Sequence, residues 1–190
     1  MTYSALEWQT STAEHVTISN GTITGTDTSS NYTSNARSTS VITTTDSIKF
    51  TLENTTDNFV AGLGKDPYSS TPHTFTAIEY GMHFSTNWYI YENGSLADSF
   101  TGSSTDTAKI TRSGSQIFYY VNDVLKYTST NQTTDDLYAQ FSAQGGASIT
   151  METNADQAAG GGGDPEPGTP LQGEGTIIEH ILYLNTRVPK

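Results

Sequence analysis

Short runs of alternating apolar and polar residues, separated by tight-turn residues, follow one another along most of the chain. In the clearest case, residues 88–92 and 95–100 flank Asn93-Gly94, and a second pair of such runs flanks Asn122-Asp123. Asn-Gly accepts positive φ at both central turn positions, so the turn twists in the same sense as two antiparallel strands. The pattern predicts two consecutive β-hairpins with two-residue turns, and therefore an antiparallel, all-β protein.

Other strand-like runs occur at short spacing, and no segment before residue 170 shows a sustained helical apolar period. About a dozen short strands with turns between them are typical of a sandwich or barrel. A chain of 190 residues is long enough to bury a core as one such domain. The further strand candidates are residues 4–9, 14–26, 41–45, 48–53, 59–64, 75–84, 108–112, 116–122, 124–128, 137–143 and 148–152.

One segment interrupts the pattern. Residues 154–175 are rich in Gly and Pro, a composition that predicts a loop or linker. Residues 177–184 are apolar and fit either a helical face or a strand, but the run is short and contains several β-branched residues, which favours a strand. We therefore expect a single domain over residues 1–190, in which a long loop precedes a final strand that returns to close a sheet.

Several motifs in order resemble one known superfamily. Phe59-Val-Ala-Gly-Leu-Gly64, Ile78-Glu-Tyr-Gly-Met82, Tyr89-Ile-Tyr-Glu-Asn-Gly-Ser95 and Ile110-Thr-Arg-Ser-Gly114 follow one another. Together with residues 117–122 they resemble concanavalin A-like lectin/glucanase modules of phage structural and bacterial surface proteins. The resemblance implies a jelly-roll β-sandwich of two antiparallel sheets. It implies little about function, because lectins, hydrolases and inert spacers share this fold.

Charge and cysteine content exclude some partners. Twenty acidic residues against eight basic ones give a net charge of −12, which disfavours nucleic acid and anionic membranes as partners. The chain has no cysteine, so disulfides and thiolate metal sites are excluded. Asp135-Asp136 and the pair Asp156 and Asp164 could contribute to loop calcium sites, but no calcium-loop spacing supports one. We predict no cofactor.

The sequence lacks the residue patterns of catalysis. Glycoside hydrolysis needs two carboxyl groups that flank the scissile bond. Glu79 lies in a predicted central strand without a carboxylate partner nearby in the strand, and no Gly-x-Ser-x-Gly motif occurs. The four histidines share no metal-ligand spacing. We therefore expect a protein that is not an enzyme, with no catalytic residue and no metal site.

The aromatic residues are the candidates for binding. Rings in the predicted central strands exceed what one core face requires, and sugars stack their C–H faces on exposed rings beside hydrogen-bonding side chains. Core packing is the alternative, because a strand covered on both faces is also aromatic on both. The carbohydrate-binding candidates are Tyr80, Trp88, Tyr91, Tyr120 and Asn122.

These observations lead to a functional hypothesis. The start of the chain has no basic and apolar export signal, which fits a phage protein made in the host cytoplasm. We expect a non-enzymatic virion module, a capsid decoration or fibre component, that contacts other structural proteins, forms an oligomer in some assemblies and binds host glycans weakly. The alternative is a bacterial surface lectin or adhesin domain that binds carbohydrate.

Overall fold

The computed structural model describes residues 2–28, 31–54, 58–65 and 78–155. These residues belong to one compact unit, and among them the only helical element is a short 3₁₀ helix, η1 (Thr10–Thr12). No helix in this described part is long and apolar enough to cross a membrane. The predicted final strand, residues 177–184, and nearly all of the predicted loop at 154–175 lie outside the described residues. The single domain over residues 1–190 therefore stays a prediction.

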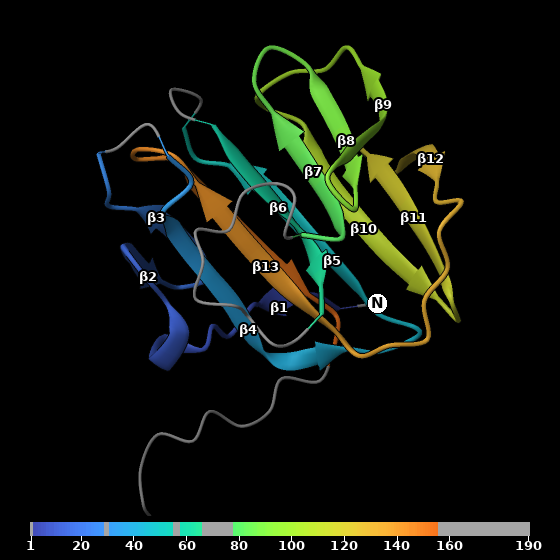
Figure 1. Ribbon diagram of the computed structural model, residues 1–190, viewed down its shortest axis with the longest axis horizontal. Coiled ribbons are helices and arrows are strands. Elements are labelled where there is room, and N and C mark those ends of the chain that lie inside the picture. The colour runs from blue at the N-terminus through green and yellow to red at the C-terminus, as the bar shows by residue number, and fades with distance from the viewer. Residues whose placement is uncertain (1, 29–30, 55–57, 66–77, 156–190) are drawn as a thin grey trace, which may run out of the picture. The chain divides into compact units, whose positions relative to one another are not determined.

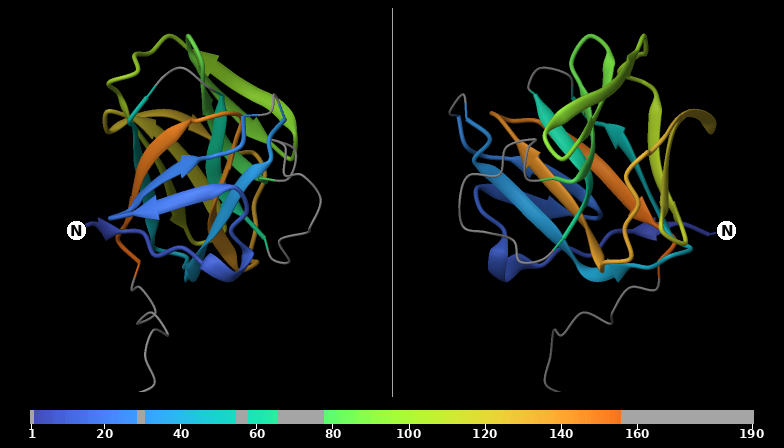
Figure 2. Two further views of the ribbon diagram at one scale, coloured as in Figure 1. Left: turned by 90° about the vertical axis from the view of Figure 1, so that its left-hand side faces the viewer. Right: turned by 45° about the vertical axis from the view of Figure 1, so that its right-hand side comes forward.

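Two antiparallel sheets make up this unit, and their faces pack together (Figures 1 and 2). In the described residues one sheet has eight strands and the other has six. The eight-stranded sheet has the order β12 (Val124–Thr128), β11 (Gln116–Val121), β10 (Thr107–Ser113), β5 (Ser47–Leu52), β14 (Ser148–Thr153), β3 (Thr22–Gly25) and β2 (Val16–Ser19), with β1 (Ser4–Ala5) paired to β14. The six-stranded sheet has the order β4 (Ser34–Ile42), β13 (Leu137–Ala143), β6 (Phe59–Gly64), β7 (Tyr80–Phe84), β8 (Trp88–Glu92) and β9 (Ser95–Phe100).

The two predicted hairpin turns are confirmed. Asn93 and Gly94 have φ of 48° and 77° and connect β8 to β9, while Asn122 and Asp123 have φ of 50° and 61° and connect β11 to β12. The prediction of one strand over residues 14–26 is wrong. Asn20-Gly21, with φ of 49° and 79°, forms a third turn of this kind and divides the run into β2 and β3.

Large rings from both sheets form the core between them. Phe50 on β5 contacts Phe59 on β6 and Trp88 on β8, with ring centroids 6.1 Å and 6.0 Å apart. Phe59 also stacks on Phe141 of β13. Burial alternates along the strands, so that every second side chain of β8 and β11 is buried between the sheets. Each such ring or aliphatic side chain contributes about 1.5–3 kcal/mol through removal from water.

A buried polar link also joins the sheets. The hydroxyl of Tyr119 on β11 donates to Oε1 of Glu92 on β8 at 3.0 Å. Asn131 donates from Nδ2 to Glu92 Oε2 at 2.7 Å. Glu92 is only 4% exposed and Tyr119 is fully buried, so these bonds satisfy groups that water does not reach.

Because of this link, we expect the free energy of unfolding to decrease at alkaline pH. Burial and then the Glu92 carboxylate raise the pKa of Tyr119 well above its ordinary value of 10.0. The folded state therefore retains a proton that the unfolded state releases, so the contribution is present in full below pH 10 and is lost as the pH rises further. We expect the denaturant midpoint of the native protein to fall above pH 10 more steeply than that of Tyr119→Phe. Equal slopes for the two proteins would contradict the buried link.

Candidate ligand-binding cleft

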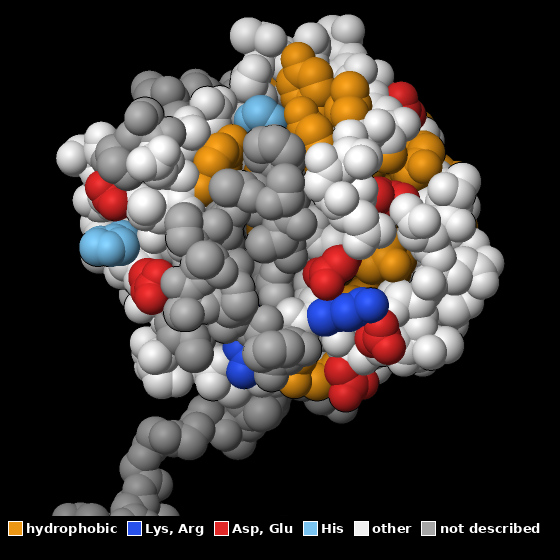
Figure 3. Space-filling model, in the orientation of Figure 1, with side chains coloured by type: hydrophobic (Ala, Val, Ile, Leu, Met, Phe, Trp, Pro, Cys, Tyr) orange, Lys and Arg blue, Asp and Glu red, His pale blue; other side chains and the backbone are white. Residues whose placement is uncertain are grey.

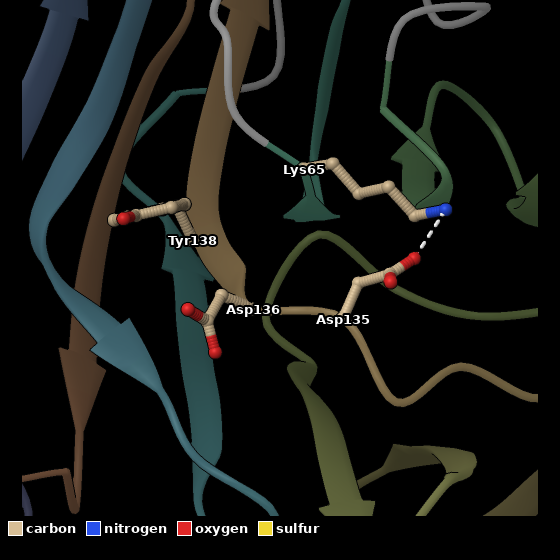
Figure 4. Close-up of a pocket in the computed structure, with 4 residues that line it drawn as sticks. All are labelled: Lys65, Asp135, Asp136 and Tyr138. Atoms are coloured by element: carbon tan, nitrogen blue, oxygen red, sulfur yellow. Dashed lines mark ion pairs between the residues drawn. The ribbon is translucent and has the colours of Figure 1, made fainter.

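The cleft lies where β6 ends and β13 begins. These strands are antiparallel neighbours, and Tyr138 pairs with Gly64, the last residue of β6. Lys65 directly follows β6, and Asp135 and Asp136 directly precede β13. Strand pairing therefore brings residues from distant parts of the sequence to one place. Lys65, Asp135, Asp136 and Tyr138 line the cleft, as Figure 4 shows.

The cleft has a cavity volume of about 450 Å³ and opens to solvent. That volume falls in the range of sites that take a small ligand. The side chains of Lys65 and Asp135 are 46% and 52% exposed, so a ligand can reach them without rearrangement of the sheet. Its lining is more polar than that of most drug-sized sites, which favours a polar ligand.

An ion pair fixes one side of the cleft. Lys65 Nζ lies 2.6 Å from Asp135 Oδ2, and the hydroxyl of Thr133 donates to the same oxygen at 3.1 Å. The hydrogen bond from Lys65, followed by that from Thr133, lowers the pKa of Asp135 below its ordinary value. The bond to Asp135 raises the pKa of Lys65 in turn. Both groups are therefore charged at neutral pH, and they lie across from one another in Figure 4.

The backbone of Lys65 is held by two further side chains. Its N–H donates to Oε2 of Glu79 at 2.9 Å, and its carbonyl accepts from Nε2 of Gln140 at 3.1 Å. Gln140 reaches this carbonyl because residue 64 is glycine. A Cβ on Gly64 would lie 2.2 Å from Gln140 Oε1, so any larger residue would displace the amide. The glycine at the end of β6 thus helps to position the lysine.

Tyr138 forms an aromatic wall of the cleft and is held by a cation. The guanidinium carbon of Arg37, on the neighbouring strand β4, lies 4.4 Å from the centroid of the Tyr138 ring. Arg37 is itself anchored, since its Nε donates to Oε1 of Gln9. A ring supported in this way loses little freedom when a ligand binds against it.

The sequence-predicted carbohydrate residues do not come together. Tyr80 and Trp88 are 4% and 0% exposed and point between the sheets, so core packing describes them and neither ring offers a face to a sugar. Tyr91 lies on the outer face of the six-stranded sheet, whereas Tyr120 lies on the outer face of the eight-stranded sheet, where Lys109 covers its ring. Asn122 is in the β11–β12 turn, and its side chain bonds Thr107 N and Asp106 Oδ1.

Tyr91 belongs to a group of rings on its own face. The ring of His83 on β7 stacks on Tyr89 at 5.6 Å and lies 6.3 Å from Tyr91. Burial lowers the pKa of His83, which favours the neutral imidazole. Figure 3 shows hydrophobic side chains around a histidine over β7 and β8, and a separate group of acidic and basic side chains elsewhere on the same face.

Sequence reasoning missed Lys65, counted Tyr138 only among the wider set of aromatic residues and not among the five binding candidates, and considered Asp135 and Asp136 only for calcium. In the described part of the chain no group of three His, Asp or Glu residues could hold a metal ion, and the lysine ammonium already bonds Asp135. Asp156 and Asp164 lie outside the described residues. The available signal was the position of charged residues at strand ends, which becomes informative only once the pairing of β6 with β13 is known.

A scan against protein-family models gives no match, and a search of the curated proteins gives none. Among solved structures, the chain is similar to the TRIM65 PSpry domain, with a TM-score of 0.60 and 11% identity over 77% of this chain and 91% of that one. It is similar to a human SPRY domain, with a TM-score of 0.58 and 14% identity over 75% and 98% of the two chains. The exoplasmic/lumenal domain of VIP36 in its Ca²⁺/Man3GlcNAc-bound form gives a TM-score of 0.52 and 8% identity over 78% and 82%.

These likenesses concern the fold. They confirm the predicted all-β, antiparallel jelly-roll sandwich of the concanavalin A-like type. At such low identity they assign no function to this chain, because the same sandwich serves unrelated roles.

Proposed function

We propose that this protein is a non-enzymatic carbohydrate-binding module whose site is the cleft of Lys65, Asp135, Asp136 and Tyr138. The observation that carries the proposal is the cleft itself, which places two carboxylates, an ammonium group and a supported aromatic ring around one cavity. In addition, the VIP36 domain, which has a similar fold, was solved with a bound oligosaccharide.

The chemistry of the cleft suits a sugar. Each sugar hydroxyl both donates and accepts hydrogen bonds, so it pairs with carboxylate oxygens as acceptors and with an ammonium group as donor. The apolar C–H face of a pyranose requires a ring surface, which Tyr138 supplies. A purely apolar ligand would displace water from the Lys65–Asp135 pair and would not replace the hydrogen bonds that this water makes.

We propose binding without hydrolysis. A general acid in glycoside hydrolysis needs a carboxyl group whose pKa is raised, so that it carries a proton near neutral pH. Asp135 has the opposite property, because Lys65 and Thr133 lower its pKa. Glu79 accepts the N–H of Lys65, a bond typical of a positioning side chain. Measurable turnover of a polysaccharide that Glu79→Gln abolishes would overturn this part of the proposal.

We further propose that the module is part of a virion, as a capsid decoration or fibre component, with a bacterial surface lectin or adhesin as the alternative. Support for this setting is the sequence resemblance alone. Co-purification with phage particles supports the virion role and its structural partners. Recovery from the surface of a bacterial cell, with glycan binding and no particle, supports the alternative.

Replacement of the aromatic wall tests the site. We expect Tyr138→Ala to weaken binding of the best oligosaccharide from a glycan array by about five- to thirtyfold, because loss of one stacking ring is worth about 1–2 kcal/mol. Isothermal titration calorimetry measures the change, and circular dichroism checks that the variant is folded. Tyr120→Ala is the matched control, since that tyrosine lies on the other sheet, away from the cleft. If Tyr120→Ala weakens binding and Tyr138→Ala does not, the proposed site is wrong.

A further inference from the structure

We infer that the cleft prefers sugars that carry a protonated amine and rejects acidic sugars, with Asp136 as the group that recognises the amine. This inference rests on the proposed carbohydrate function and specifies its ligand class. Its basis is the set of charges that line the cavity. Lys65 and Asp135 form an ion pair, whereas the carboxylate of Asp136 has no partner among the described residues.

The lysine of the cleft is already occupied. Its ammonium lies 2.6 Å from Asp135 Oδ2, and the carboxylate of Glu79 is close enough to raise the pKa of Lys65 as well. An anionic ligand that bonds Lys65 would lie beside the carboxylate of Asp135, which repels it. Lys65 is therefore a poor receptor for an acidic sugar, although its remaining N–H groups can still bond neutral hydroxyls.

The other nearby cation is also committed. The guanidinium of Arg37 lies against the ring of Tyr138 and donates from Nε to Gln9. Arg37 therefore covers one face of the Tyr138 ring, and it is not among the described residues that line the cavity. Arg112 is the smallest of the influences that lower the pKa of Asp135, and this buried residue donates from its guanidinium to the backbone carbonyls of Ile42 and Thr133.

Asp136 has no such compensation. Its side chain is exposed and lines the cavity, and within the described residues no hydrogen bond or ion pair reaches its carboxylate. Among the described residues that line the cavity, Lys65 and Asp135 neutralise one another, so the carboxylate of Asp136 is in excess, and the whole chain carries −12. Charges closer than the Debye length of about 8 Å at physiological salt act on one another with little screening. A ligand amine that reaches the cavity meets an unpaired carboxylate.

The test compares sugars that differ in one substituent. The probes are the tetramers of glucosamine, of N-acetylglucosamine and of galacturonic acid, together with spermidine as an amine without a sugar. Calorimetry is carried out at a pH at which the amines are protonated. We expect the glucosamine tetramer to bind about two- to fivefold tighter than its acetylated counterpart, as one exposed charge pair allows. The acidic tetramer should not bind measurably.

Two variants assign the effect to Asp136. Asp136→Asn removes the charge and keeps the shape, so the preference for the amine should disappear and the amine and acetyl tetramers should bind the variant with equal affinity. Asp98→Asn on β9 changes the net charge by the same amount at a distance from the cleft and should retain the preference. Loss of the preference in both variants would overturn the role of Asp136, since it would show a general charge effect.

The outcomes separate this inference from the function on which it rests. Equal affinity for the amine and acetyl tetramers overturns the inference and leaves carbohydrate binding intact. Tight binding of spermidine alone supports recognition of the amine and overturns the carbohydrate function. Absence of binding by all four probes, or tighter binding of the acidic tetramer, overturns the charge argument outright.

Discussion

Trp88→Ala is expected to lower the free energy of unfolding by about 3–5 kcal/mol, the usual cost of truncating a buried tryptophan. The indole is fully buried, and its centroid lies 6.0 Å from that of Phe50 and 5.1 Å from that of Phe84. Neighbouring strands are fixed by their own pairings and can close only part of the resulting cavity. Urea unfolding followed by circular dichroism measures the loss.

Tyr91→Ala on the same strand is the matched comparison. Tyr91 points to the outer face and is only partly buried, so its truncation should cost about 1 kcal/mol, near the average for a point substitution. If Trp88 were instead an exposed ring that binds sugars, Trp88→Ala would cost less stability than Tyr91→Ala. A loss of stability for Trp88→Ala no larger than that for Tyr91→Ala would contradict the described core.

Glu92→Ala is expected to have the second large effect, a loss of about 3 kcal/mol. The substitution removes the acceptor of Tyr119 and of Asn131, and the Tyr119 hydroxyl is then buried without a partner. Unsatisfied buried groups and lost bonds to a charge cost about 1–3 kcal/mol each. Denaturant unfolding near pH 7 is the measurement.

A double-mutant cycle separates this bond from general packing. Tyr119→Phe in the Glu92→Ala background should cost much less than Tyr119→Phe in the native protein, because the hydroxyl has already lost its acceptor. Additive losses would show that Glu92 and Tyr119 do not interact, and the polar link between the sheets would then be wrong.

Local features of the fold were predictable because they depend on neighbouring residues. Asn93-Gly94 and Asn122-Asp123 tolerate positive φ wherever they occur, so the turns and the flanking strands follow from the sequence. The same chemistry at Asn20-Gly21 was available and was overlooked. Strand order was not predictable, because β14 pairs with β5 and β3 through contacts between distant parts of the chain.

The candidate site was harder to predict from the sequence, because it too depends on contacts between distant parts of the chain. Alternation in β8 separates Trp88, Ile90 and Glu92 from Tyr89 and Tyr91 but does not say which set faces inward. The structure places the first set in the core, which removes Trp88 from the surface. Lys65 and Tyr138 are brought together only by the register of β6 against β13, and no local pattern encodes that register.

Chemical-shift mapping by NMR tests the central claim most directly. Titration with the best oligosaccharide from the glycan array should shift the amide resonances of Lys65, Asp135, Asp136 and Tyr138 in a saturable manner, with small changes at Tyr120 and Asn122. Saturable shifts that cluster at Tyr120 and Asn122 and leave the cleft unchanged, or no saturable shift with any glycan, would contradict the assignment of this cleft as a carbohydrate site.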